Sequence, residues 1–322
     1  MKKILAVALL LTGVITVSFP ILAQNSAGAG QALEVSPPVK TLTADPGQTI
    51  NTEISIRNVS NVDLIVSGQI NDFVASGEDG TPKILLDEED DENPYSFKEW
   101  VDPFTDLLLV PREIKILPIT INVPVNASPG GHYGVIRFTG GAPELDETGV
   151  ALSASLGTLM LITVTGETEE KLEIEEFSIN QNGVSGTSFQ SAPLQFVERL
   201  RNTGNNHLLP SGQVIIKDMF GKKVAALNVN LPPRNILPQS IRRFEQPLDN
   251  TVIGNKRLFG RYTADMQITY GADDQTLTQS ITFWIIPYKL IGLIIGGLII
   301  GFIALRFLLQ RYNRYIVEKA KR

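Results

Sequence analysis

The sequence predicts an all-β fold: two immunoglobulin-like β-sandwich domains in tandem, followed by one C-terminal transmembrane α-helix. Three observations carry this prediction. Short runs of alternating apolar and polar residues recur through residues 33–286, the second half of that region repeats part of the first, and one long apolar run lies near the carboxyl end. Alternation with a period of two, enriched in Val, Ile and Thr, is typical of strands with one buried face.

The expected strands are bounded by Pro, Gly, Asn and Asp, the residues that favour turns. Between the apolar segments at the two ends of the chain, no long apolar stripe recurs at helical spacing. Many short strands in modules of roughly 100–130 residues indicate β-sandwiches. The clearest expected strands are 52–57, 64–70, 114–123, 134–139, 158–165, 172–179, 213–218, 262–269 and 276–286.

An internal repeat shows that the two modules share one fold. Residues 57–70 read RNVSNVDLIVSGQI and residues 201–214 read RNTGNNHLLPSGQV, with seven identities in fourteen positions. Asn side chains in such a turn bond neighbouring amides. Tyr133 and Tyr262 each follow a glycine by two positions at a strand start, where a tyrosine hydroxyl can tie back to the backbone. We therefore expect structural roles for these residues.

The domain boundaries follow from composition. Residues 33–166 form the expected first domain and residues 167–286 the second, with the boundary at the polar stretch GETEE. Residues 24–32 are an expected flexible leader. Residues 1–23 are typical of a secretory signal peptide, because two lysines precede an apolar core and the segment ends in a small residue. An uncleaved N-terminal anchor is the alternative.

The apolar run LIGLIIGGLIIGFIALRFLL predicts a transmembrane helix over 287–309, followed by a basic cytoplasmic tail over 310–322. The 20 residues of the apolar run, with a helical rise of about 1.5 Å each, span the roughly 30 Å hydrocarbon layer. Six cations and one anion from Arg306 onward place the C-terminus in the cytoplasm and the N-terminus outside the cell, in a single-pass type I topology. The expected interfacial residues are Trp284, Tyr288, Lys289, Arg306 and Arg311.

Four glycines in the span form two tandem G-x-x-x-G patterns: Gly292, Gly296, Gly297 and Gly301. Small residues four apart allow two helices to approach closely, so a homodimer is one interpretation. The alternative is that glycine is simply frequent in membrane helices.

Composition excludes several classes of function. The chain has no Cys and only two His, so disulfides, thiolate zinc sites and Cys nucleophiles are ruled out. A net charge of −6 disfavours nucleic-acid binding. No hydrolase, phosphate-binding or zinc-protease motif is present, so we expect no enzyme and no cofactor. An envelope hydrolase with paired carboxylates is an alternative that nothing in the sequence favours.

Two neighbouring segments of the first domain are candidate binding sites. The acidic run holding Asp87, Asp90 and Asp91 could bind Ca²⁺, although it lacks the spacing of a calcium loop and a solvated acidic loop explains it equally. Tyr95, Phe97 and Trp100 follow it closely. Exposed aromatic rings there would form a contact surface for glycan or protein, whereas the alternative is that they pack in the core.

The layout resembles the WxL-interacting protein family of bacterial surface proteins. The matching residues are Leu33–Pro37, Asp45–Gln48, Arg57-Asn58 and, above all, the segment from Val123 to Gly134 with ASPGGHYG at its end. The resemblance implies a signal peptide, two immunoglobulin-like domains, one membrane helix and a basic tail. It also implies a first domain that binds peptidoglycan and a second that engages surface proteins.

We therefore expect a membrane-anchored bacterial cell-surface protein whose domains bind cell-wall glycan or a surface protein, for adhesion or envelope scaffolding. It contacts membrane lipid through one helix. An extracytoplasmic chaperone-like factor that binds clients by strand addition is one alternative. A receptor-like protein that pairs through its transmembrane glycines is another.

Overall fold

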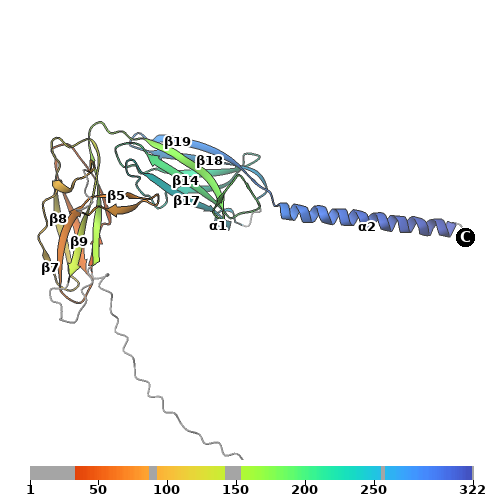
Figure 1. The fold of residues 1–322 in the computed structure, drawn as a ribbon, viewed down its shortest axis with the longest axis horizontal. Coiled ribbons are helices and arrows are strands. Elements are labelled where there is room, and N and C mark those ends of the chain that lie inside the picture. The colour runs from red at the N-terminus through yellow and green to blue at the C-terminus, as the bar shows by residue number, and fades with distance from the viewer. Residues whose placement is uncertain (1–32, 87–92, 142–153, 255–257, 321–322) are drawn as a thin grey trace, which may run out of the picture.

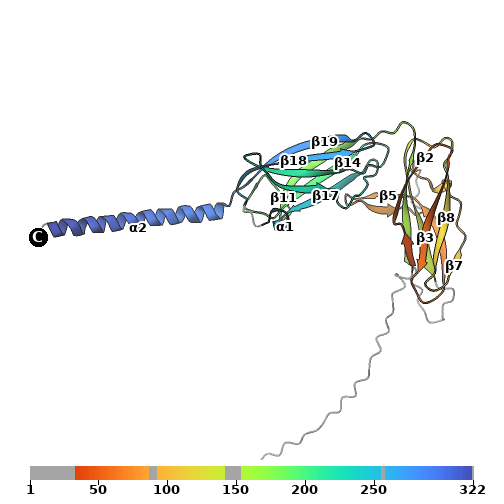
Figure 2. The same ribbon diagram turned by 180° about the vertical axis from the view of Figure 1, so that it is seen from behind.

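The computed structural model describes residues 33–86, 93–141, 154–254 and 258–320. Over these ranges the chain forms two β-sandwiches and one long helix, which confirms the predicted fold class (Figure 1). The two sandwiches together have the shape of an L, and the helix leaves the far end of the second one (Figures 1 and 2). The predicted signal peptide and leader lie outside the described residues, as do Asp87, Asp90 and Asp91.

The first sandwich packs a three-stranded sheet against a five-stranded sheet. The isoleucines of the smaller sheet, such as Ile54 and Ile119, meet Phe138 and Ile162 of the larger one in a dry core. Period-two alternation is the reason, since every second side chain of each strand faces the other sheet. In spatial order the sheets are β1 (Leu33–Ser36), β3 (Thr49–Asn58), β8 (Ile114–Asn122), and β2 (Val39–Ala44), β10 (Ala154–Val164), β9 (Gly130–Gly141), β4 (Leu64–Asn71), β7 (Leu107–Leu109).

Two features of the first sandwich matter below. After Ser36 the chain crosses from one sheet to the other, so that β2 lies parallel to β10 at the edge of the larger sheet. The hairpin of β5 (Phe73–Ser76) and β6 (Thr81–Ile84) projects from this sandwich toward the second one (Figures 1 and 2).

The second sandwich has the same plan. Its core is larger in aromatic content, with Phe196 and Phe283 in edge-to-face contact at 5.8 Å between ring centres. A four-residue helix, α1 (Asn250–Ile253), follows β17. In spatial order the sheets are β12 (Val184–Ser185), β11 (Leu172–Gln181), β14 (Leu194–Asn202), β17 (Ile241–Leu248), and β13 (Ser188–Phe189), β19 (Gln275–Ile285), β18 (Gly260–Tyr270), β15 (Ser211–Asp218), β16 (Lys223–Val229).

The repeat found in the sequence recurs as one hydrogen-bond arrangement. In the first sandwich the amide of Asn58 donates to the carbonyl of Val62 (2.7 Å) and to that of Leu109 (3.0 Å). In the second, Asn202 donates to Asn206 (2.7 Å) and to Ile236 (2.9 Å). Both asparagines are fully buried, and the oxygen of each accepts from the backbone two residues ahead. The predicted structural role of these asparagines is confirmed.

The paired tyrosines have diverged. Tyr262 ties back to its own chain as predicted, because its hydroxyl accepts from the Phe259 amide (2.9 Å) and donates to the Phe259 carbonyl (3.2 Å). The same prediction is wrong for Tyr133, whose hydroxyl faces His207 of the second sandwich instead.

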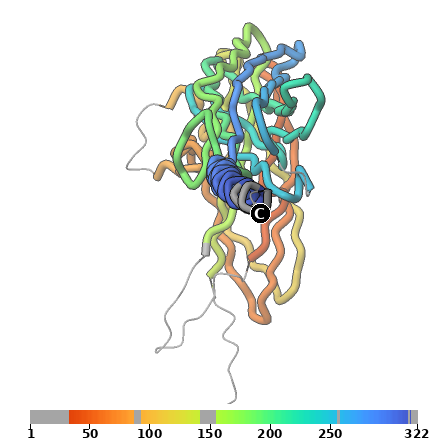
Figure 3. Tube along the Cα trace, turned by 90° about the vertical axis from the view of Figure 1, so that its right-hand side faces the viewer, coloured from red at the N-terminus to blue at the C-terminus, as the bar shows by residue number. Residues whose placement is uncertain are grey.

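Helix α2 (Tyr288–Ala320) contains the predicted span and extends past Leu309 into the predicted tail. Residues Tyr288–Asn313 are long and apolar enough to cross a membrane, with a mean hydropathy of 2.4 over the most apolar window, and none of that window is buried against the protein. The helix continues the long axis of the second sandwich (Figures 1 and 2), and Figure 3 looks along it toward the sandwiches.

Candidate functional site: the joint between the sandwiches and an open strand edge

The aromatic residues nominated from the sequence do not form one surface. Phe97 is fully buried and Trp100 is 9% exposed, both in the core of the first sandwich. The ring of Trp100 packs on buried His132, 4.4 Å between ring centres. For these two residues the packing alternative describes their position, because neither presents a free ring face. Tyr95 is half-buried and belongs to a cluster at the joint between the sandwiches.

That cluster is apolar and uncharged. Tyr133 packs on Tyr95 and on Phe73 of the hairpin, and Leu237 of the second sandwich covers it. The imidazole of His207 meets the Tyr133 ring edge-to-face at 5.7 Å. Burial lowers the pKa of His207 to about 4 and raises the pKa of Tyr133, so both are neutral near pH 7.

A second zone of the joint is built from backbone. The Gly131 amide donates to the Asn205 carbonyl (2.8 Å), and the Asn205 side chain donates to the Pro129 carbonyl (3.2 Å). Glycine is required here, since a Cβ on Gly131 would collide with the Tyr133 hydroxyl and Gly130 has a φ of 122°. The segment ASPGGHYG, which carried the family resemblance, thus forms half of this joint.

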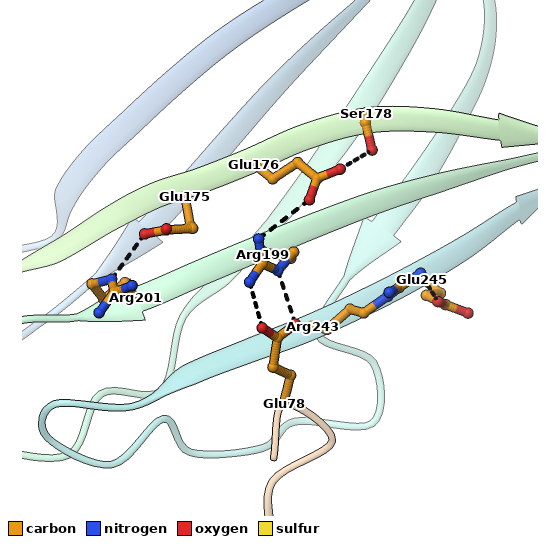
Figure 4. Close-up of polar contacts among 8 residues, drawn as sticks. All are labelled: Glu78, Glu175, Glu176, Ser178, Arg199, Arg201, Arg243 and Glu245. Carbon is orange, nitrogen blue, oxygen red and sulfur yellow. Dashed lines mark hydrogen bonds and ion pairs between the residues drawn. The ribbon is translucent and has the colours of Figure 1, made fainter. Parts of the chain in front are cut away.

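A third zone joins the hairpin tip to the second sandwich (Figure 4). Glu78 accepts two hydrogen bonds from the guanidinium of Arg199, and the Nε–Oε2 distance is 2.8 Å. The Glu78 carbonyl also accepts from the Arg243 amide of β17 at 2.7 Å. Arg242 reaches the Asp79 carbonyl at 2.9 Å and lies against Gly80, where any side chain would collide with it.

The Glu78–Arg199 pair continues a row of ion pairs on the outer face of the β11–β14–β17 sheet, two of them between β11 and β14 and one within β17. Arg199 also meets Glu176 at 3.4 Å, Arg201 meets Glu175 at 2.8 Å, and Arg243 meets Glu245 at 2.6 Å (Figure 4). The guanidinium of Arg199 lowers the pKa of Glu78, so this carboxylate is ionised near pH 7. Three separate zones therefore hold the two sandwiches in one orientation.

A cleft of about 280 Å³ opens beside the hairpin, between the two sandwiches. Its walls are mostly apolar, including Phe73, Leu161 and Ile236, with Arg242 at one side. That guanidinium already donates to two backbone carbonyls, those of Asn235 (2.6 Å) and Asp79 (2.9 Å). Arg234 also lines the cleft, so two cationic residues contribute to its otherwise apolar walls.

A more distinctive feature is the edge of the second sandwich formed by β19. In the first sandwich the equivalent strand, β10, is covered over Leu159–Val164 by β2, and its inward side chains, such as Met160 and Ile162, are fully buried. In the second sandwich β13 covers β19 at Trp284 and Ile285 only. Within the described part of the chain, β19 has no other partner on this side.

The exposure of side chains follows this difference. Phe283 and Ile285, next to β13, are fully buried. Leu277 and Ile281 point the same way but are only half-buried, and Gln279 between them is exposed. The uncovered stretch also lacks the usual protection of an edge strand, because β19 reads QTLTQSITFWI with no charged residue and no proline. In the ranges that the structure describes, no strand pairs with the main chain of Gln275–Phe283 on this side.

The remaining nominated residues all lie near or on α2. Trp284 and Tyr288 are 45% and 59% exposed, and Gln190 donates to the Tyr288 hydroxyl at 2.5 Å. Lys289, Arg306 and Arg311 are exposed. Open space surrounds Gly292, Gly296, Gly297 and Gly301, as a helix partner would require, and the pairing stays a prediction. Among the described residues, no group of three His, Asp or Glu side chains could hold a metal ion.

Neither the joint between the sandwiches nor the open edge of β19 was predicted from the sequence. Glu78 and Arg199 carried no pattern of their own, because they lie far apart in the sequence, and Asn205 belongs to the repeated turn, which predicted a bond within its own turn and not one to the other sandwich. For the edge a signal was available: 276–286 is a predicted strand without charge or proline, which is unusual for an edge.

Comparison with known proteins shows likeness of fold only. No protein-family model matches the chain, and no curated protein matches its sequence. Similar solved structures include the YadV chaperone (10% identity, TM-score 0.36, 78% of this chain and 100% of that one). The Salmonella enterica SafA pilin in complex with the SafB chaperone is similar at 8% identity and a TM-score of 0.37, over 78% of this chain and 96% of that one. The E. coli chaperone DraB is similar at 13% identity and a TM-score of 0.36, over 79% of this chain and 96% of that one. At these values the likeness is to the arrangement of strands, and nothing about ligands or partners is taken from it.

Proposed function

We propose that this chain is a single-pass membrane protein of the bacterial cell surface that binds an extended segment of another protein by strand addition along β19. The observation that supports the proposal is the uncovered, uncharged edge from Gln275 to Phe283. Strand addition supplies main-chain hydrogen bonds for affinity and pockets for alternate side chains for specificity.

The chain itself provides the geometry for such a partner. Both strands that cover an edge of this type, β2 on β10 and β13 on β19, run parallel to the strand they cover. An added segment would extend β13 toward Gln275, parallel to β19. Apolar residues at alternate positions would bury Leu277 and Ile281, which are now half-buried. The occupant is therefore an extended, largely uncharged segment with alternating apolar residues.

A protein partner suits the described surface better than a glycan. Glycan recognition uses free aromatic faces, and Phe97 and Trp100, which the sequence nominated for it, are buried. The open edge offers backbone donors and acceptors in a strand geometry, which another strand satisfies most completely.

The membrane anchor is the other part of the proposal. Tyr288–Asn313 has the length and hydropathy of a span, and the excess of positive charge after it supports an orientation with the sandwiches outside the cell. Peptidoglycan binding and adhesion, which the family resemblance implies, are the competing outcomes of the experiment below.

Site-specific photo-crosslinking on intact cells tests the proposed edge. A benzoylphenylalanine at Thr282 of β19 is compared with one at Asn228 of β16, which is exposed on the opposite edge of the same sheet. We expect a protein adduct at 282 and none at 228. Gln279→Lys should remove the adduct, because a charge on the inward face would be buried by an added strand, whereas Thr278→Lys on the outer face should retain it.

The two lysine variants also decide between partners. Both positions are exposed in the free chain, so neither substitution should change its thermal stability. Adducts at both edges, or an adduct at 282 that survives Gln279→Lys, would contradict strand addition. Sedimentation of the purified full chain with peptidoglycan, equally in both variants, would favour the glycan partner instead.

A further inference from the structure

The end of the second sandwich nearest α2 gathers most of its exposed large apolar side chains. In the described part of this sandwich eight such side chains are exposed, and only Leu209 and Leu231 lie at the other end, by the joint. The remaining six are Val184, Met219, Phe220, Val252, Phe259 and Trp284. Phe220 is 87% exposed and Phe259 is 60% exposed. Exposing aromatic rings to water to this extent is unfavourable in free energy.

The strand register places these residues at the exit of the chain toward α2. Asp218, just before Met219 and Phe220, pairs with Tyr262 of β18. Gly260, just after Phe259, pairs with Ile285, the last residue of β19. The methyl group of Met219 lies against Gly260, where a Cβ would collide with it. The two loops are therefore side by side at one end of the sheet.

The Phe220 loop is a fixed structure. The amide of Phe220 donates to the Asp218 carboxylate (2.9 Å), and the Gly221 amide donates to the Asp218 carbonyl (2.9 Å). The Asp218 amide donates to the Lys222 carbonyl at 2.9 Å and closes the turn. Phe220 is thus held away from the sandwich, not left outside it by chance.

The link between this end and α2 is short. Only Ile286 and Pro287 separate β19 from the helix, a reach of about 10 Å at most. The link is also fastened, since the Ile286 amide donates to the Phe189 carbonyl (2.7 Å) and Gln190 donates to the Tyr288 hydroxyl (2.5 Å). Helix α2 continues the long axis of the sandwich (Figures 1 and 2), and the register places Phe220 and Phe259 at the end from which it leaves.

We infer that this end of the second sandwich is a membrane-contact surface, in which Phe220 and Phe259 insert into the interface of the leaflet that holds α2. The inference rests on the membrane anchor of the proposed function. Aromatic rings partition to the region between headgroups and acyl chains. Lys222, Lys223 and Arg261 are exposed at the same end and suit lipid phosphates. The protein thus has two contacts with lipid, the helix and the loops, and these fix the tilt of the sandwiches.

Spin labelling tests this surface, and the absence of cysteine makes single labelling sites clean. The full chain is reconstituted in vesicles of phosphatidylcholine and phosphatidylglycerol, with labels at Phe220→Cys or Phe259→Cys. Matched controls are Leu231→Cys, 70% exposed at the opposite end, and Val125→Cys, 84% exposed in the first sandwich. Leu298→Cys reports on the span itself. Collision rates with oxygen, which concentrates in lipid, are compared with those of a water-soluble nickel complex.

We expect labels at 220, 259 and 298 to favour oxygen several-fold, and labels at 125 and 231 to favour nickel. A lipid-like signal at 298 with a water-like signal at 220 and 259 would overturn the inference and leave the anchor in place. A water-like signal at 298 would overturn the membrane anchor as well, so the two failures are distinguishable.

Discussion

Glu78 at the tip of the β5–β6 hairpin and Arg199 on β14 form a forked ion pair that joins the two sandwiches, 121 residues apart in the sequence. A fork of two parallel hydrogen bonds constrains orientation as well as distance. Because the Glu78 carbonyl also accepts from the Arg243 amide, the hairpin tip is held by both side chain and backbone.

The first prediction concerns the Glu78–Arg199 ion pair between the sandwiches. Glu78→Gln removes the charge of the pair and should let the angle between the sandwiches vary, while each sandwich stays folded. Spin labels at Val125→Cys and Phe220→Cys would report a broader distance distribution by double electron–electron resonance. Glu175→Gln, which breaks an ion pair with Arg201 inside the second sandwich, is the matched control and should leave the distribution unchanged. Equal broadening in both variants would contradict a role of the Glu78–Arg199 pair in fixing the angle between the sandwiches.

The second prediction compares two glycines of β9. Gly131→Ala should destabilise the protein by about 2 kcal/mol, because the new methyl group displaces the Tyr133 hydroxyl from the joint. Gly140→Ala should change stability by no more than about 0.5 kcal/mol, since the nearest atom to its new Cβ lies at 3.6 Å. Urea unfolding of the two variants measures the difference, and similar midpoints would show that Gly131 is not required by the joint.

The third prediction uses a buried carboxyl. Glu198 on β14 is fully buried, with the side-chain amide of Gln246 beside it, and burial raises its pKa to about 8. A raised pKa means that the folded protein prefers the protonated acid. The contribution of Glu198 to the stability of the second sandwich should therefore be most favourable below about pH 4.5, the ordinary pKa of the group, and should be lost as the pH rises through about 8.

Glu198→Gln mimics the protonated acid and should remove this dependence. At pH 7 the variant should be more stable than the wild type by roughly 3 kcal/mol, and near pH 4 the two should be similar. Thermal or urea unfolding across this range measures the effect. Parallel pH curves for the two proteins would show that Glu198 is not neutral in the folded state.

The fourth prediction tests the duplicated asparagines. Asn58→Ala removes the side-chain donor to the buried Leu109 carbonyl and the part-buried Val62 carbonyl, and Asn202→Ala removes the donor to two buried carbonyls, so each should cost about 2–3 kcal/mol. The loss should stay local: hydrogen exchange should speed up in the first sandwich for Asn58→Ala and in the second for Asn202→Ala. A variant that loosened both sandwiches equally would show that the two units are not separate.

The sequence predicted what repeats and what alternates. Period-two patterning gave both sandwiches, and Asn58 and Asn202 share their bonds because the turn R-N-x-x-N is duplicated. It could not assign Phe97 and Trp100 to the core, since they lie in an irregular segment where no period indicates burial. The Glu78–Arg199 ion pair forms only where the two folded sandwiches meet, which no local sequence pattern encodes. The open edge of β19 depends on how late the chain crosses from β11 to β13, which only the structure shows.

The alignment of α2 with the second sandwich gives an anchored molecule a defined height. The eleven residues of β19 rise about 36 Å at roughly 3.3 Å each, so an anchored second sandwich would hold the first about that far from the lipid. The first sandwich extends to the side of this axis (Figure 1). A segment added along β19 would run along the second sandwich toward the bilayer. Under the proposed function, a partner would have to bring a strand into the narrow layer next to the membrane, which favours neighbours that are themselves tethered there.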